Sequence, residues 1–132
     1  MKRHELRTDR APLPSGAYSQ GLRVGDFVYV AGQVGRDAVT GELAEGIEAQ
    51  TARAIENISM ILQAGGASLS DVVKATVHLK DMNDFKAFDR VYGRYFPDPK
   101  PVRTTVGSYL PKALVEIDVV AYAPLAGQHR KE

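Results

Sequence analysis

Alternating apolar and polar positions predict two strands near the start of the chain, over 18–24 and 27–34. The pair Gly25-Asp26 separates them and suits a tight hairpin turn, because glycine accepts a positive φ freely. The stretch 37–42 that follows is rich in turn-forming residues. The chain is therefore expected to begin with a hairpin and then a loop.

The apolar period then changes from two to about 3.6, which predicts a helix from Ile47. Its apolar stripe has steps of three and four residues and comprises Ile47, Thr51, Ile55, Ile58 and Leu62. Gly65-Gly66 follows directly and can adopt the left-handed conformation that ends helices.

A third strand is predicted after this helix, with one buried and one polar face. Its expected buried residues are Val73, Ala75, Val77 and Leu79, and they alternate with Lys74, Thr76, His78 and Lys80.

A second helix is predicted from its aromatic spacing, since Phe85, Phe88, Tyr92 and Tyr95 repeat at three and four. Side-chain oxygens in 81–84 suit its N-cap, and Pro97, Pro99 and Pro101 exclude its continuation. Two strands, over 103–109 and 114–122, then complete the order ββαβαββ.

This order predicts one two-layer α+β domain over 1–132, with two helices on one face of a mixed sheet. The other sheet face is expected to carry semi-polar side chains, among them Thr76, His78 and Glu116. Such a face meets solvent or packs against copies of itself, so an oligomer is compatible with the pattern.

Composition removes several classes of function. The 132 residues contain 17 Lys and Arg against 16 Asp and Glu, a net charge of +1, so no strong field favours nucleic acid or an acidic membrane. The absence of cysteine excludes disulfides and thiol chemistry. The charged N-terminus lacks a signal-like apolar segment and no run is long enough to cross a membrane, which favours a soluble cytoplasmic protein. Both termini, including Arg130 and Lys131, are expected to be solvated.

Common catalytic motifs are also absent. The chain has no nucleophile elbow, P-loop or dinucleotide fingerprint. His4, His78 and His129 are too far apart for a metal-binding spacing, so no metal site is expected. His78, on the polar side of its strand, is expected to be a hydrogen-bonded surface or interface residue.

The remaining candidates lie near strand ends. Glu116 interrupts a nearly apolar segment, and it is either solvated beside Asp118 or partly buried for a function. Arg103 follows the proline-rich turn, where its planar fork suits a small carboxylate or phosphate, although a surface arginine fits the same position. Tyr18 and Gly32 complete the set, with Gly32 marking either a close ligand approach or a bulge.

Taken in order, these segments resemble the RidA/YjgF family of imine deaminases, and the similarity spans nearly the whole chain. The residues that carry it are Ala11-Pro12, Gly16-Ala17-Tyr18-Ser19-Gln20, Ala31-Gly32-Gln33, Thr40-Gly41, Gln50-Thr51, Asn57, Ala64-Gly65-Gly66, Asp71-Val72-Val73-Lys74, Leu79-Lys80-Asp81-Met82-Asn83-Asp84-Phe85, Pro101-Val102-Arg103, Leu110-Pro111 and Val115-Glu116-Ile117.

The resemblance implies a chorismate-mutase-like subunit in a homotrimer, with sheets lining a central barrel and sites in clefts between neighbours. It implies hydrolysis of 2-iminobutanoate, 2-iminopropanoate and related enamine acids to 2-keto acids and ammonia, without a cofactor, as a defence against reactive metabolites. Arg103 matches the carboxylate anchor, Glu116 the residue that positions water, and Tyr18 a site tyrosine. The backbones of Gly32 and Thr105 match positions that contact the bound acid.

Several positions depart from the family pattern. Ala17 replaces the usual proline, and Ala31, Thr105 and Asp89 stand where serine, cysteine and asparagine are frequent. The last three are expected to alter the lining of the pocket, and a carboxylate at Asp89 that faces the cleft would repel an anionic substrate.

Three alternatives to a short-chain deaminase remain. One is deamination of a larger enamine acid such as 2-aminomuconate, and another is a regulatory module that binds a small carboxylate without catalysis. RNA cleavage is suggested only by the older description of the family, and the near-neutral charge and lack of clustered aromatics argue against it.

Overall fold

The computed structural model describes residues 2–125. Its helices and strands are β1 (Arg3–Leu6), β2 (Gly21–Val24), β3 (Phe27–Gln33), α1 (Gly46–Ala64), β4 (Val72–Leu79), α2 (Phe85–Tyr95), β5 (Val102–Gly107) and β6 (Val115–Tyr122), with short 3₁₀ turns at Leu69–Asp71 and Met82–Asp84. His129, Arg130 and Lys131 lie outside the described residues.

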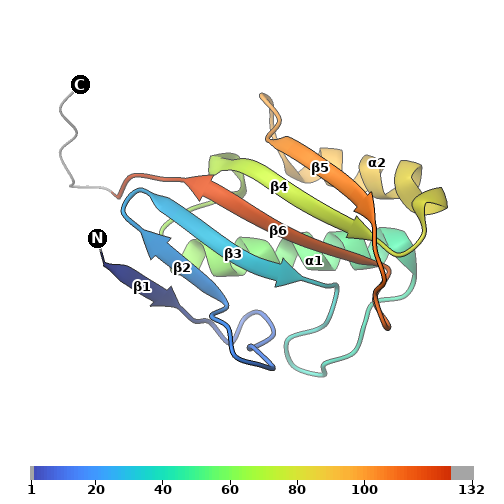
Figure 1. The fold of residues 1–132 in the computed structure, drawn as a ribbon, viewed down its shortest axis with the longest axis horizontal. Coiled ribbons are helices and arrows are strands. Elements are labelled where there is room, and N and C mark those ends of the chain that lie inside the picture. The colour runs from blue at the N-terminus through green and yellow to red at the C-terminus, as the bar shows by residue number, and fades with distance from the viewer. Residues whose placement is uncertain (1, 126–132) are drawn as a thin grey trace.

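The strands form one sheet in the order β1-β2-β3-β6-β4-β5. The β4–β5 pair is parallel and the other pairs are antiparallel, so the sheet is mixed. Both helices lie behind the sheet in the view of Figure 1, on one and the same face. The predicted two-layer α+β architecture is therefore confirmed.

The local signals behind the predicted elements are visible in the structure. Gly25 adopts φ 58° in the turn between β2 and β3, and Gly66 adopts φ 80° just after α1. The apolar stripe of α1 faces the sheet: Thr51, Ile55, Ile58 and Leu62 are fully buried. In α2, Phe88 and Tyr92 are buried as predicted, and their rings lie 5.5 Å apart.

The N-terminus differs from expectation. Arg3–Leu6 was expected to be solvated, yet it forms the edge strand β1, which pairs antiparallel with β2 and buries Leu6. With one apolar residue in four, this segment has no visible period, and only the unpaired edge of β2 makes it a strand. The segment 18–20 was likewise expected in a strand but precedes β2 as irregular chain.

In β4, Val73 is the exception to the predicted pattern. The pairing of β4 with β6 shifts between Val72 and Lys74, which turns Val73 outward to 45% exposure and buries Val72 instead. One inserted residue reverses the faces of the residues before it, so simple alternation places this side chain on the wrong side. Ala75, Val77 and Leu79 are buried as predicted.

Candidate functional site

The site residues predicted from the sequence fall into two hollows. Tyr18, Gly32 and Glu116 line one of about 270 Å³, and Asp89 and Arg103 line another of about 380 Å³. The structure therefore brings the predicted residues together in two groups rather than one.

Glu116 forms the wall of the first hollow. It lies on β6 between Val115 and Ile117, which face the buried core, so its half-buried side chain lies on the opposite face of the sheet. Asp118 lies on the same face, and burial raises the pKa of the Asp118 carboxyl group. Glu116 thus combines parts of both alternatives, since it lies beside Asp118 and is also partly buried.

Gly32 brings its backbone against Glu116. A Cβ atom on Gly32 would lie 2.9 Å from Glu116 Cδ and 3.1 Å from Oε2. The pairing between β3 and β6 is also irregular between Val30 and Gln33. The bulge expected at Gly32 is confirmed, and the glycine also permits the close approach of the Glu116 side chain, while the approach of a ligand stays a prediction.

Tyr18 reaches the first hollow from the irregular segment before β2. It is 51% exposed, and its hydroxyl accepts a hydrogen bond from the Ser15 N–H at 3.3 Å. The buried Gln20 anchors this segment by accepting from the Thr8 N–H and donating to the carbonyls of Thr8, Ala11 and Pro12. Tyr18 therefore belongs to a segment that the hydrogen bonds of Gln20 hold in place.

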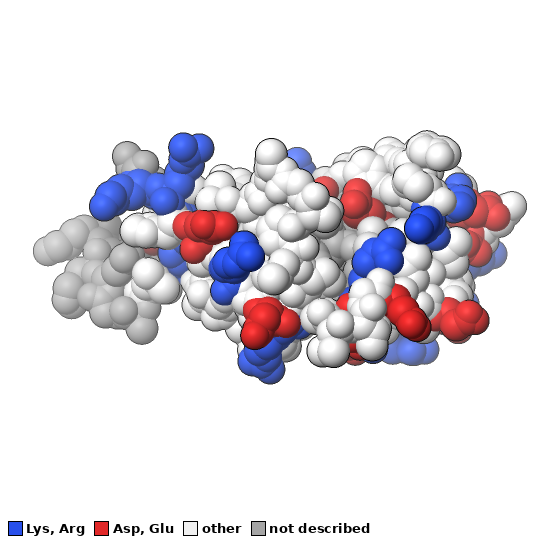
Figure 2. All heavy atoms as spheres, turned by 90° about the horizontal axis from the view of Figure 1, so that it is seen from below, with Lys and Arg blue, Asp and Glu red and all other residues white. Residues whose placement is uncertain are grey.

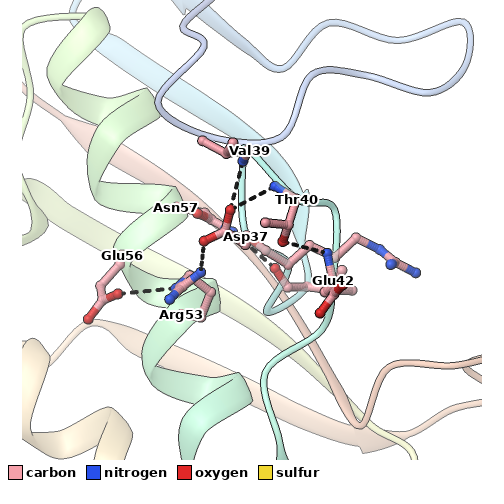
Figure 3. A network of polar contacts seen from close by, with 9 residues as sticks. Asp37, Val39, Thr40, Glu42, Arg53, Glu56 and Asn57 are labelled. Atoms are coloured by element: carbon pink, nitrogen blue, oxygen red, sulfur yellow. Dashed lines mark hydrogen bonds and ion pairs between the residues drawn. The ribbon is translucent and has the colours of Figure 1, made fainter.

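The loop after β3 is held by a polar network around Asp37 (Figure 3). Asp37 Oδ1 accepts from the N–H groups of Val39 and Thr40, and Arg53 of α1 donates to Oδ2 at 2.9 Å. These backbone hydrogen bonds are the main cause that holds the pKa of Asp37 below its ordinary value. Asn57 adds bonds to the carbonyls of Val34 and Arg36, so α1 fixes the chain that borders the first hollow.

Arg103 is the centre of the second hollow. Its guanidinium carbon lies 4.7, 5.3 and 5.5 Å from the ring centres of Tyr92, Phe88 and Phe85 on α2. Its NH1 group donates to Asp89 Oδ1 at 2.8 Å. Stacking on aromatic faces and an ion pair each restrict a guanidinium, so this side chain is held in one place.

Tyr92 also lines the second hollow. Its hydroxyl is the one buried side-chain polar atom without a hydrogen-bond partner among the described residues. Burial raises the pKa of this hydroxyl, the nearby Arg103 acts in the opposite direction, and Asp89 raises it further. The group is therefore a neutral phenol beside a cation.

The two hollows lie on opposite faces of the sheet. In β4, Ala75 pairs with Arg103 and His78 pairs with Glu116. Ala75 and His78 are an odd number of residues apart, so their side chains, and those of their partners, leave the sheet on opposite sides. Arg103 and Glu116 of one chain consequently do not share a cleft.

Three other expectations have simple outcomes. Ala31 directly precedes Gly32 and Thr105 lies two residues beyond Arg103, but neither is among the described residues that line the two hollows. His78 Nδ1 lies 2.7 Å from Ser108 Oγ, so it is hydrogen-bonded as expected.

Sequence reasoning missed Arg36, Lys100 and the role of Tyr92 in the hollows. Arg36 borders the first hollow, and Lys100 the second. Their only signal was a charge near a strand end or turn, which most surface residues share. Tyr92 belonged to an aromatic helix face, and a packing role accounts for that pattern fully.

Over the described part of the chain, surface charge, the helices and the metal-binding side chain types point to no further site besides these two hollows. Figure 2 shows cationic and anionic side chains interspersed over one face, with no large area of a single sign. Within residues 2–125, no helix is both long and apolar enough to span a membrane. The same residues contain no group of three or more metal-binding side chains of the His, Cys, Asp and Glu types.

Comparison with known proteins finds extensive similarity. The family model described as Endoribonuclease L-PSP matches residues 8–123. A RutC family protein of Pyrococcus abyssi is 50% identical over 125 residues, covering 92% of this chain and 98% of that protein. The 2-iminobutanoate/2-iminopropanoate deaminase of Dermatophagoides farinae is 41% identical over 118 residues, covering 87% and 92%.

Solved structures agree with these relatives. The crystal structure of E. coli TdcF with bound serine has a TM-score of 0.85 and 32% identity, covering 90% of this chain and 98% of that one. The similarity therefore extends over nearly the whole fold.

Proposed function

The chain belongs to the Endoribonuclease L-PSP family, which includes the RidA/YjgF deaminases, and we propose that it hydrolyses short 2-imino and enamine acids to 2-keto acids and ammonia. A deaminase-type activity is supported by relatives that carry that name at about 40% identity. The proposed substrates are 2-iminobutanoate and 2-iminopropanoate.

The observation that carries the proposal is the position of the Arg103 side chain and the hydrogen-bond donors that it leaves available. Its side chain is 20% exposed and opens on a hollow, while only its NH1 group has a hydrogen-bond partner among the described residues. Its Nε and NH2 groups form an edge that matches the two oxygens of a carboxylate. A guanidinium fixed by three rings binds such a group with little further loss of conformational freedom.

Hydrolysis needs a water molecule placed at the imine carbon. Glu116 accepts a proton from that water as its oxygen bonds to the carbon, forming a carbinolamine. Glu116 then returns this proton to the nitrogen, and the C–N bond breaks as the carbinolamine hydroxyl gives its remaining proton to Glu116, so that ammonia leaves and the keto group forms. A protonated imine is already electrophilic, so positioning of water contributes more than strong basicity. Tyr18 orients the water or the nitrogen through its hydroxyl.

This mechanism requires Arg103 of one subunit and Glu116 of its neighbour, because the two residues of one chain lie on opposite sheet faces. We propose a homotrimer in which each site lies between two chains. The sheet face away from the helices supports association, since it exposes several large apolar side chains: Phe27, Tyr29, Val106 and Tyr122. Burial of such a patch is the usual driving force of assembly.

The test is a coupled assay in which threonine dehydratase supplies 2-iminobutanoate and the release of 2-ketobutyrate is followed under conditions of slow spontaneous hydrolysis. Wild-type protein is expected to accelerate release, and Arg103→Ala to lower kcat/KM by about 100-fold, the scale of a lost charge-assisted pair. Arg90→Ala is the matched control, since Arg90 lies on α2 and, within residues 2–125, pairs only with the exposed Glu48. No acceleration by wild type, or equal rates for wild type and Arg103→Ala, contradicts the proposal.

A further inference from the structure

Asp89 places a negative charge beside the carboxylate anchor. Its Oδ1 accepts from Arg103 NH1 at 2.8 Å, and both side chains line the same hollow. The hollow therefore presents a cation and an anion side by side, rather than the cation alone that a simple carboxylate requires.

Both members of this pair keep capacity for a ligand. Among the described residues nothing donates to Asp89 Oδ2, and the Asp89 side chain is 50% exposed. Arg103 keeps its Nε–NH2 edge without a described partner. The pair thus offers donors and acceptors at adjacent points.

Lys100 is the third charged residue that lines the hollow, and it does not change the balance between the charges of Arg103 and Asp89. Lys100 donates to the carbonyls of Gly93 and Phe96 near the end of α2, and its Nζ lies 3.8 Å from Asp98 Oδ1, which offsets its charge. The remaining local charge of Arg103 and Asp89 sums to about zero, so a simple anion gains little from the field and meets repulsion from Asp89.

We propose that Asp89 makes this hollow a receptor for zwitterions, in which the carboxylate and a cationic nitrogen are attached to the same carbon. Arg103 binds the carboxylate through its free edge, and Asp89 accepts a hydrogen bond from the iminium or ammonium nitrogen. Because these two ligand groups are separated by a single carbon atom, they match two protein groups in direct contact. The inference rests on the proposed function, since it assigns the substrate class of the same anchor.

The consequence is selection by charge. The protonated form of a short 2-imino acid satisfies both partners. An enamine acid with a second carboxylate brings an additional anion to a hollow that already contains one, so Asp89 disfavours it. Asp89 is in this sense a specificity-determining residue, and it also holds the cationic nitrogen in place during attack by water.

The test compares two ligands with one carbon skeleton, by calorimetry at neutral pH on the assembled protein. L-2-Aminobutyrate carries an ammonium group where 2-ketobutyrate carries a neutral keto oxygen. Wild type is expected to bind the amino acid more tightly. Asp89→Asn is expected to lower the ratio of the two affinities by about tenfold, the scale of one charge-assisted hydrogen bond at a half-exposed group.

Two variants control for side effects. Asp89→Glu keeps the charge and is expected to keep the preference for the zwitterion. Glu45→Gln removes one negative charge outside the hollow, at a side chain that caps nothing at the start of α1, and is expected to leave the ratio unchanged.

The outcomes separate the inference from the proposed function. An equal rise in affinity for both ligands in Asp89→Asn would show that Asp89 only competes for Arg103, and it would overturn the inference, as would an unchanged ratio. If wild type deaminates 2-iminobutanoate but does not prefer the amino acid, zwitterion recognition fails while the deaminase survives. If the same preparation lacks activity, the proposed function fails.

Discussion

Gly32 lies directly against the carboxyl group of Glu116, at a distance that leaves no room for a side chain on Gly32. Gly32→Ala would place its Cβ 2.9 Å from Glu116 Cδ, so Glu116 must move away. Because the proposed water-positioning group is displaced, kcat in the coupled assay is expected to fall by about tenfold or more, with KM little changed.

Gly107→Ala is the control for this substitution, since the atoms nearest to a Cβ there, from Met82 and the Leu79 carbonyl, lie at ordinary contact distances of 3.4–4.0 Å. It is expected to retain wild-type kcat. Full activity of Gly32→Ala would contradict the positioning of Glu116 by this glycine.

Mixing two inactive variants tests whether the site spans two chains. Arg103→Ala and Glu116→Gln are each expected to be nearly inactive as homotrimers. In a co-folded equal mixture, about a quarter of the sites combine an intact Arg103 with an intact Glu116, so activity is expected to return to about a quarter of wild type. Light scattering confirms that the mixture is trimeric. A verified mixed trimer without activity would exclude a site shared in this way.

The buried amide of Gln20 links the N-terminal segment to the site. Gln20→Leu removes four hydrogen bonds to the backbone of residues 8, 11 and 12. The free energy of unfolding is expected to fall by about 2–4 kcal/mol, measured by urea denaturation, because buried backbone groups lose their partners. Gln63→Leu is the matched control, since Gln63 is exposed and its amide donates, among the described residues, only to Ser59. Equal destabilisation by both variants would contradict a special role of Gln20.

The charge of Asp37 is expected to make the stability of the fold depend on pH. Its pKa in the folded state lies below the ordinary value of 3.8, chiefly because the N–H groups of Thr40 and Val39 donate to it. The charged form is thus favoured by folding, so its contribution is complete above pH 3.8 and is lost as the pH falls through the lower folded-state pKa.

Urea midpoints of wild type and Asp37→Asn measure this dependence. The midpoint of the variant is expected to be lower at pH 7, and the difference is expected to shrink as the pH falls below 3.8. The midpoint of Glu42→Gln, in the same loop, is expected to equal that of wild type at pH 7 and also below pH 3.8. A difference that stays constant with pH would show that the charge of Asp37 does not stabilise the fold.

Local sequence patterns were sufficient to predict most of the helices and strands. The stripe of α1 and the aromatic face of α2 were visible as periods, and Gly25 and Gly66 adopt the positive φ that their turns require. Each of these features depends on residues close in sequence, where geometry alone links the pattern to the structure. The same holds for Glu116, whose polarity was conspicuous within an apolar strand.

Residue identities along the chain thus determined the two-layer fold and named the residues with unusual chemistry. They did not determine that β1 would pair, that Val73 would turn outward, or that Arg103 and Glu116 would leave opposite faces of the sheet. These features depend on which strand lies beside which and in what register, and contacts between distant segments decide this. The ion pair between Asp89 and Arg103 is of the same kind, because it joins a helix and a strand that only the folded chain brings within 2.8 Å.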